Sequence, residues 1–552
     1  MSTGTPVRGR HVAPGQVHPD PPTRSSRATG TWSLLRFALR RDRVRLPVWV
    51  AAAAGLVAVQ SVASQGTYDT PQALAGYAEV AQANAAVIAM TGRPVGLETV
   101  ERAVAFEIYA VVAVLVGLMS VFTVVRHTRA DEAEGRTELV LAAAVGRRAP
   151  LLAALGTAVV ANLAVVAATW AAAVVTGLPP AGSLLLGASF GAVGLAFAGI
   201  TAVAAQLVEN GRPASAVGGA AVAVAFALRA AGDVQDSALT WLSPIGWGQA
   251  AYPFWLDRWW PLLLPVLAFV LLGAVALALL DRRDVGAGLL AARPGTATAG
   301  PLLRGPAGLA WRLQRGTVTG WGVGLLAAGV VYGSLVTATA DLVEQAPELL
   351  DMIPGGADSI VDGYLVITVF FLAVLAACAG VAMVLRLRGE EQSGRAEPVL
   401  ATPVARARWA ASHVAVGLVV PTAALLFAAL ACGLTAVATG SPTAVVGDAL
   451  RGALVTAPAV WVLVAATVAL WGLGTRLAPL AWLLVAWTGV VLVLGDSLDL
   501  PGWARAVSPL HHVPQVPLEA ASAGAPLALA GVAVVLLGLG LAAFRRRDLT
   551  TG

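Results

Sequence analysis

Long apolar runs constrain this chain more than any other feature of its sequence. Runs of 18 or more apolar residues with few charges recur along its 552 residues, and each is long enough to cross a bilayer as a helix. Only 12% of the residues are charged, about half the share found in soluble globular proteins. Because only helices and closed barrels satisfy their backbone in lipid, and these runs are too long for barrel strands, we predict an all-α polytopic membrane protein.

Twelve membrane spans are expected from these runs. Their positions in the sequence are near 46–64, 103–125, 151–177, 182–207, 214–231, 260–280, 318–340, 363–385, 409–437, 446–474, 478–495 and 525–544.

The distribution of arginine predicts how the spans are oriented. An even number of spans places both termini on one side, and all 36 basic residues are arginine. The absence of lysine, with heavy use of Ala, Val, Leu and Gly, is typical of a GC-rich bacterial genome. Basic residues concentrate in cytoplasmic segments, so we expect a protein of the bacterial plasma membrane with both termini in the cytoplasm. In that orientation 30 arginines lie inside, and six lie outside: Arg93, Arg102, Arg229, Arg258, Arg451 and Arg505.

A charged segment between two apolar runs occurs twice. Residues 129–147 align with 388–406 at an offset of 259, with ten identities in nineteen positions. Residues 282–284 reappear as 546–548 at an offset of 264. Because the same order of motifs recurs along the chain and each half holds six spans, we predict two tandem six-helix halves of the same orientation, a parallel repeat.

This repeat divides the chain into four expected regions. The halves are joined by a Gly/Pro/Ala-rich linker, and the N-terminal stretch has the composition of a disordered cytosolic tail. The regions are the tail at 1–30, the first half at 31–283, the linker at 284–308 and the second half at 309–552.

The first half opens with an amphipathic segment, residues 32–46. Three arginines follow one helical face at i, i+4 and i+7 from Arg36, and an apolar group that begins at Leu34 lies roughly opposite. The pattern suits a helix lying in the inner headgroup layer. A simple anchor that flanks the first span is the alternative.

The two charged segments carry more pattern than a plain loop requires. Each has a glycine break and then a short apolar run that we expect to be helical. Glu138 and Glu397 would lie near the start of that helix, where the helix dipole favours an acid, and Arg147 and Arg406 near its end. The apolar residues of the run have little cytosolic mass of this chain to pack against, which suggests a partner protein. The alternative is a positive-inside loop that was duplicated with its half.

The pattern Glu-x-x-Gly-Arg-x-Glu-x-x-Leu-x-x-x-Val-x-Arg at 132–147 resembles the coupling-helix region of permeases in the type 2 ABC exporter superfamily. The fused twelve-span form resembles the actinobacterial permeases described as polyketide-antibiotic exporters. This resemblance covers essentially the whole chain. It implies that two copies of an ABC ATPase subunit dock on the repeated segments and bind ATP and Mg, and that the machine extrudes hydrophobic or amphipathic compounds such as antibiotics or drugs.

The residues that the resemblance assigns to ATPase coupling lie in both copies of the motif. The second copy departs from the pattern with Pro398 and Pro403, and Pro403 is expected to shorten its helix and weaken docking there. The assigned residues are Glu132, Gly135, Arg136, Glu138, Leu139, Leu141, Val145 and Arg147, and Glu391, Gly394, Arg395, Glu397, Leu400, Val404 and Arg406.

The sequence argues for a separate ATPase and against an enzymatic role. A Walker A loop needs a lysine on the phosphates, and this chain has none. The adjacent His511 and His512 point apart in a helix or strand, so no metal site is expected, and no cofactor is expected to bind this chain. Expected partners are the ATPase, membrane lipid and a lipophilic small-molecule substrate, with no nucleic acid.

Three residues are candidates for the substrate pathway or a gate. Glu107 lies early in the second span, where an acid is a functional candidate by default; placement at the interface is the alternative. Trp241 and Trp247 belong either to an interfacial aromatic belt or to an outer gate or re-entrant turn. A second functional class, an ion-coupled secondary transporter of lipophilic substrates, needs titratable groups within the spans, which are few here.

Overall fold

A computed structural model describes residues 27–290, 298, 300, 303, 305–344, 356–495 and 500–549. Throughout this part of the chain the regular elements are helices, and no strand occurs. The chain separates into two compact units, residues 1–294 and 295–552. Most of the expected tail at 1–30 and the middle of the expected linker at 284–308 lie outside the described residues.

Each expected span coincides with an apolar helix. Eleven helices of the described chain are long and apolar enough to cross a membrane, and a shorter apolar helix at 478–493 occupies the position of the eleventh expected span. The prediction of an all-α polytopic membrane protein is therefore confirmed.

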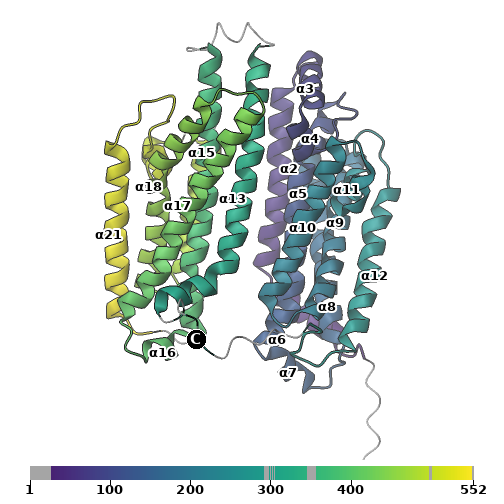
Figure 1. The fold of residues 1–552 in the computed structure, drawn as a ribbon. Helices are drawn as coiled ribbons and strands as arrows, with labels where there is room; N and C mark the ends of the chain where they lie inside the picture. The colour runs from purple at the N-terminus through teal and green to yellow at the C-terminus, as the bar shows by residue number, and fades with distance from the viewer. Residues whose placement is uncertain are drawn as a thin grey trace, which may run out of the picture. The chain divides into compact units, whose positions relative to one another are not determined.

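The first half is a bundle of membrane-length helices with short helices at both ends (Figure 1). Figure 1 shows α7 at one end of this bundle and α3 and α4 at the other. Its elements are α1 Thr31–Arg41, α2 Arg45–Thr67, α3 Pro71–Ala83, α4 Ala85–Thr91, α5 Val100–Val125, η1 Arg126–Ala130, α6 Asp131–Ala133, α7 Arg136–Leu141, α8 Ala149–Val175, α9 Pro180–Leu207, α10 Gly211–Val234, η2 Ala238–Leu242, α11 Pro244–Gln249, η3 Trp260–Leu262 and α12 Leu263–Leu280.

The centre of the first half is formed by α5 and α9. Their most apolar windows are 72% and 78% buried, against 17% for α2 and 22% for the segment that contains α12. Val112 and Val116 of α5 lie in one apolar core with Phe190 and Phe197 of α9. The apolar outer faces of α2 and α12 are exposed in the bundle, and contact with lipid tails, which are also apolar, carries no desolvation penalty.

The second half repeats this plan, and in Figure 1 α16 lies at one end of its bundle. Its central helices α15 and α18 have windows that are 61% buried, whereas those of α13 and α21 are 17% and 22% buried. Its elements are α13 Pro306–Glu344, α15 Gly356–Gln392, α16 Ala396–Leu400, α17 Arg406–Ala438, α18 Ala444–Leu473, η5 Ala478–Leu480, α19 Ala481–Leu494, α20 Gly502–Ala506, η6 Pro509–His512 and α21 Gly524–Arg546.

Two glycines allow α13 to lie directly on α17. A Cβ atom at Gly329 would lie 2.1 Å from the carbonyl oxygen of Ala428, and one at Gly333 would lie 2.2 Å from that of Cys432. Small residues four apart let helix backbones approach closely in lipid, where packing rather than the hydrophobic effect drives association.

The halves differ where they begin. In the first half the expected amphipathic segment forms a separate helix, α1, which ends at Arg41 and is followed by a break at residues 42–44. Its Ala38 is buried, and the α1 side chains Trp32 and Phe37 are each 62% exposed. In the second half the equivalent arginines, Arg312 and Arg315, lie within the continuous helix α13.

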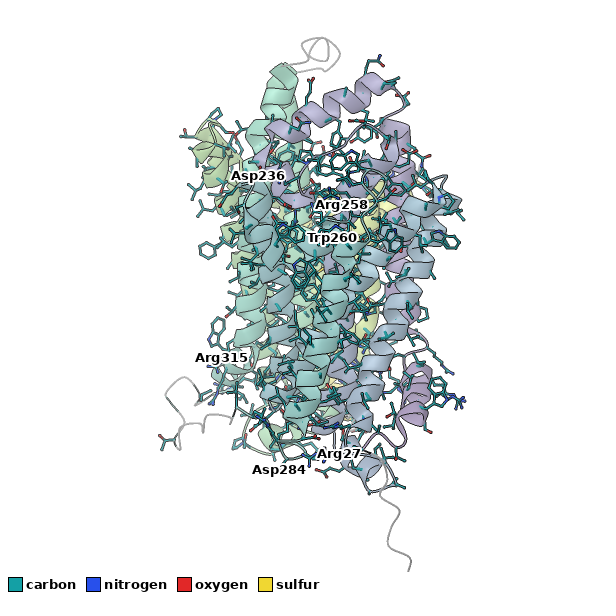
Figure 2. The ribbon with its side chains drawn as sticks, turned by 90° about the vertical axis from the view of Figure 1, so that its right-hand side faces the viewer. Arg27, Asp236, Arg258, Trp260, Asp284 and Arg315 are labelled. Atoms are coloured by element: carbon teal, nitrogen blue, oxygen red, sulfur yellow. The ribbon has the colours of Figure 1, made fainter. Side chains whose placement is uncertain are left out.

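Several charged residues of the first half lie toward its two ends (Figure 2). Arg27 and Asp284 lie toward one end, and Asp236, Arg258 and Trp260 lie toward the other. At the first of these ends Arg27 and Asp281 form an ion pair of 3.1 Å.

Candidate functional site

The repeated charged segments begin as continuations of membrane helices. In the first half α5 runs on through the π-helical turn η1 into α6, and in the second half α15 runs to Gln392. Gly135 and Gly394 then turn the chain with φ angles of +71° and +70°. Only glycine adopts this left-handed conformation without strain, which explains the glycine break in both copies.

A buried ion-pair cluster holds this segment in the first half. Glu132 of α6 accepts hydrogen bonds from both terminal nitrogens of Arg283, at 2.6 and 3.0 Å, and from Nη1 of Arg129 at 2.7 Å. Nε of Arg283 donates to Oε1 of Gln206 at 2.8 Å. The side chains of Arg129 and Arg283 are only 0% and 3% exposed. The cluster therefore joins the ends of α5, α9 and α12.

The second half has an equivalent cluster. Glu391 of α15 accepts a hydrogen bond from Nη2 of Arg547 at 2.8 Å, a second one from Nη1 of the same guanidinium, and one from Nε1 of Trp471 at 3.1 Å. The Arg547 guanidinium also lies 5.2 Å from the centre of the Phe544 ring. This cluster joins the ends of α15, α18 and α21.

Corresponding residues build the two clusters. Glu132 matches Glu391 at the repeat offset of 259, and Arg283 matches Arg547 at 264. The sequence prediction of the site omits both arginines, although the repeat of residues 282–284 as 546–548 is a signal for them. Because Glu132 and Glu391 are each bound by partners of their own half, they hold the segment in place.

A second pair of contacts closes each glycine turn. Nη1 of Arg136 binds Oδ1 of Asp131 at 3.1 Å, and Nε of Arg395 binds Oε2 of Glu390 at 2.9 Å. In the first half Asp131 also accepts a hydrogen bond of 2.6 Å from Arg41 of α1. The Gly-Arg step that occurs in both copies of the motif therefore has a structural role inside each half.

The closing arginines lie elsewhere than expected. The prediction placed Arg147 and Arg406 at the ends of the short helices, but α7 ends at Leu141 and α16 at Leu400. Arg147 lies just before α8 and donates to the carbonyl oxygens of Leu280, at 3.1 Å, and of Arg283. Arg406 begins α17 and donates to the carbonyl oxygen of Arg547 at 3.1 Å. Both arginines therefore bind the chain where the sixth membrane helix of their half ends.

The apolar residues of the first segment differ in exposure. Leu139 is 77% exposed. Leu141 is half-buried and lines a small cavity with Pro150, Leu151 and Leu280, and Val145 is half-buried close to Gly30. The expectation that these residues have little to pack against is therefore correct for Leu139 and wrong for the other two, because the start of α8 and the end of α12 lie against Leu141, and the residue before α1, Gly30, lies against Val145.

In the second segment most apolar residues pack against their own half. Val399, Leu400 and Val404 are partly buried against the main core of that half, whereas Pro398, the counterpart of Leu139, is exposed. Pro403 does not shorten α16, which contradicts our expectation. Helices α16 and α7 end at equivalent residues, Leu400 and Leu141, so the helix stops before the proline in one half and stops without any proline in the other.

The residues of α7 and α16 that stay exposed make a small surface on each half. Apart from Arg136, which closes the glycine turn, the exposed residues of α7 are Glu138 and Leu139, and those of α16 are Glu397 and Pro398. Glu138 and Glu397 lie in the first turn of their helices, where the helix dipole favours an acid. We call Glu138 with Leu139, and Glu397 with Pro398, the exposed tips of the two segments.

A buried carboxylate joins α1 to the same region. Oδ2 of Asp42 lies 2.6 Å from Nε2 of His127, and its Oδ1 lies 2.8 Å from Nε of Arg126. Burial acts to raise the pKa of Asp42, but the hydrogen bond and charge of His127, together with Arg126, outweigh it and lower the pKa. The carboxylate therefore stays charged and fixes the break between α1 and α2.

The remaining candidates belong to the opposite end of the first half. Glu107 is half-buried two turns into α5. Nε1 of Trp247 donates to the carbonyl oxygen of Trp241 at 2.6 Å, and the rings of Trp241 and Trp260 stack at 5.8 Å. Trp247 belongs to α11, most of which is buried, whereas Trp241 is 44% exposed.

One buried pair at this end was missed by sequence reasoning. Arg229, with 0% exposure, lies 3.6 Å from Asp233 and donates to the carbonyl oxygen of Met90 at 3.1 Å. The pair is spaced i, i+4 on one helix face, which is the signal that could have revealed it. It ties α10 to the chain at the end of α4.

Comparisons with known proteins agree on one class of membrane protein. Residues 303–545 match the family model described as the C-terminal domain of multidrug efflux system permease Rv1217c. The chain is also 39% identical, over 534 residues, to the multidrug efflux system permease protein Rv1217c of Mycobacterium tuberculosis, and the match covers 96% of each chain.

Proposed function

The chain belongs to the family of multidrug efflux system permeases, and on that premise we propose that it is the membrane-spanning subunit of an ATP-driven exporter. Its cargo would be hydrophobic or amphipathic compounds such as antibiotics or drugs. Two copies of an ABC ATPase subunit, one on each half, would bind ATP and Mg and supply the energy.

The observation that carries this proposal is the pair of exposed tips on α7 and α16. A leucine that is 77% exposed on a six-residue helix contributes nothing to the stability of its own half. That helix is nevertheless held by a buried cluster of ion pairs, which costs desolvation energy. A rigidly mounted, exposed contact is what docking of a second protein requires, and its repetition in the second half supports a partner present in two copies.

The energy source must lie outside the chain. A phosphate-binding Walker A loop needs a lysine, and all 36 basic residues here are arginine. We therefore expect the purified chain alone to hydrolyse no ATP. ATPase activity that stays with the isolated chain would contradict the proposal.

Leu139→Asp tests the docking role directly. The tagged permease is co-expressed with an ABC ATPase from the same genome, and retention of the ATPase on purification is measured beside drug efflux. Burial of a leucine against a partner contributes about 1.5–3 kcal/mol, and a carboxylate there adds a desolvation cost, so both ATPase retention and efflux should be lost. Glu138→Arg should act in the same direction. Leu141 is a poorer target because it packs within its own half.

Leu290→Asp is the matched control. Leu290 is 63% exposed in the same half and lies after α12, where its backbone N–H donates to the carbonyl oxygen of Leu207. This variant should keep both the ATPase and efflux. If Leu139→Asp also keeps both, the tip is not a docking site, and efflux that continues without any ATPase would support ion-coupled transport instead.

We also propose that both termini and both charged segments face the cytoplasm. The argument is the excess of 30 arginines over six on the two sides. In a variant whose Cys378 and Cys432 are replaced by alanine, single cysteines are introduced at the exposed, equivalent positions Ala142 and Ala401, and at Ala75 on the expected outer side. An impermeant thiol reagent added to intact cells should label only the cysteine at position 75. Labelling at 142 or 401 would reverse the orientation.

A further inference from the structure

Glu107 is an acidic residue whose hydrogen-bond partners carry no opposite charge. Its Oε2 accepts hydrogen bonds from Nε2 of Gln60 at 2.6 Å and from the hydroxyl of Ser64 at 2.7 Å, and its Oε1 accepts one from the hydroxyl of Tyr68 at 2.6 Å. All three donors are neutral. In the described part of the chain Glu107 forms no ion pair, and the nearest arginine in sequence, Arg102, donates instead to the carbonyl oxygen of Val95.

Aromatic rings stand beside this carboxylate. The rings of Tyr68 and Tyr77 stack at 4.8 Å, and Tyr77 meets the ring of Phe106 edge-on at 6.3 Å. Phe106 is buried and the two tyrosines are half-buried, so the site is partly open. Burial, together with the neighbouring Glu107 carboxylate, raises the pKa of both phenols, which therefore remain neutral hydrogen-bond donors.

The fold does not require this cluster. At the repeat offsets of 272 and 259, the positions of Gln60, Ser64 and Glu107 correspond to Tyr332, Val336 and Val366 in the second half. Val336 and Val366 are buried there among apolar side chains. The same pair of helices therefore packs with valine in place of the glutamate at this position, so the cluster in the first half is available for a functional role.

Because a carboxylate beside aromatic faces is the arrangement that recognises organic cations, we propose that Glu107, Tyr68 and Tyr77 form a binding site for the cationic group of lipophilic substrates. The site lies in the first half only, at the end of the bundle opposite α7. The inference rests on the proposed export function, because it names the chemical class of the cargo.

Direct binding to the purified permease tests the site without any ATPase. The full chain is placed in nanodiscs of zwitterionic phosphatidylcholine, which does not itself attract cations, and binding of radiolabelled tetraphenylphosphonium is measured at equilibrium. Glu107→Gln keeps the size of the side chain and removes its charge, and it should weaken binding by roughly tenfold or more. Binding of the neutral dye Nile red should not change.

Two further variants keep this test decisive. Glu101→Gln removes a charge from the first turn of the same helix and should leave tetraphenylphosphonium affinity within about twofold, since screening weakens distant charges. Glu107→Asp keeps the charge and should retain more affinity than Glu107→Gln if the charge, and not only the fold, is what the cation needs. Thermal unfolding of each variant is followed in parallel.

Several results would overturn the proposed site. One is that the wild-type chain binds no tetraphenylphosphonium, or binds it with the same affinity as Glu107→Gln. Another is that Glu101→Gln loses as much affinity as Glu107→Gln, or that Glu107→Asp loses as much as Glu107→Gln. Failure of the proposed export function would be recognised separately. Leu139→Asp should lose the ATPase and keep tetraphenylphosphonium binding, because position 139 is on α7 at the other end of the half.

Discussion

Helix α7 of the first half spans six residues directly after Gly135, and helix α16 of the second half spans five residues that begin one position later relative to Gly394. In both, a glutamate on the preceding helical segment binds an arginine that follows the sixth membrane helix of its half. What differs is the tip, which carries Leu139 in one half and Pro398 in the other. Duplication has therefore preserved the contacts that hold the segment and changed the surface that the segment presents.

The ion-pair clusters that hold the two segments also differ in charge balance. In the first half Glu132 is shared by two buried guanidiniums, those of Arg129 and Arg283. In the second half Glu391 binds Arg547, whose side chain is 16% exposed, and the indole of Trp471. The first cluster is the more dependent on its carboxylate, because both guanidiniums that it binds are buried, whereas that of Arg547 is partly exposed.

The largest expected effect follows from that difference. Glu132→Ala should destabilise the purified permease by about 3–5 kcal/mol, the usual cost of breaking a buried ion pair, and Glu391→Ala should cost less. Thermal unfolding in detergent measures both. The control is Glu134→Ala, whose carboxylate is 53% exposed and whose loss should cost about 0–1 kcal/mol. Equal destabilisation by Glu132→Ala and Glu391→Ala would show that the two clusters are energetically alike.

A smaller effect is expected at the tips, and it concerns binding. Leu139→Ala should weaken the free energy of ATPase binding by roughly 1.5–2 kcal/mol, because it removes most of the apolar area that a partner could bury. Pro398→Ala should weaken it less, since the proline ring presents less apolar area. Titration of the ATPase against each immobilised variant measures the difference. A stronger loss for Pro398→Ala would identify the second half as the main docking site.

Substitution of the turn glycine should destabilise the two halves equally. Gly135→Ala and Gly394→Ala each place a Cβ where nothing lies within 4 Å, so the cost is only that of a left-handed backbone, about 1–2 kcal/mol. Thermal unfolding should show the same decrease in both variants. Asparagine, which tolerates this conformation better, should recover part of the loss at either position. An effect confined to one half would mean that its turn also contacts something beyond the chain.

The smallest effect is expected for the arginines that close the turns. Arg136→Ala and Arg395→Ala remove guanidiniums that are 49% and 53% exposed, and ion pairs of this exposure contribute about 0–1 kcal/mol. The loss should shrink further at high salt, because screening weakens exposed pairs. Unfolding measured at low and high ionic strength tests this, and a loss above 2 kcal/mol that salt leaves unchanged would show that the turns are held as tightly as the buried clusters.

Several features of the protein could be predicted from its sequence because they follow from local composition. The number and positions of the apolar helices follow from the length of apolar runs, since a bilayer admits little else. The glycine turn at Gly135 could be recognised from its recurrence at Gly394, and the start of the short helix from Glu138. The family resemblance also rested on these motifs, and the comparisons confirm it.

Only the tertiary structure decided which residues of the motif face inward. Glu132 was predicted to take part in coupling, but it is bound by Arg283, which lies 151 residues away in sequence. Leu141 is covered by the start of α8 and the end of α12, and Arg147 binds carbonyl oxygens at the end of α12 and just after it. Such contacts depend on which helix ends meet in space, and hydrophobic periodicity carries no information about that. The sequence by itself determined the helices and where each turns, and the packing of their ends decided which side chains were left exposed for a partner.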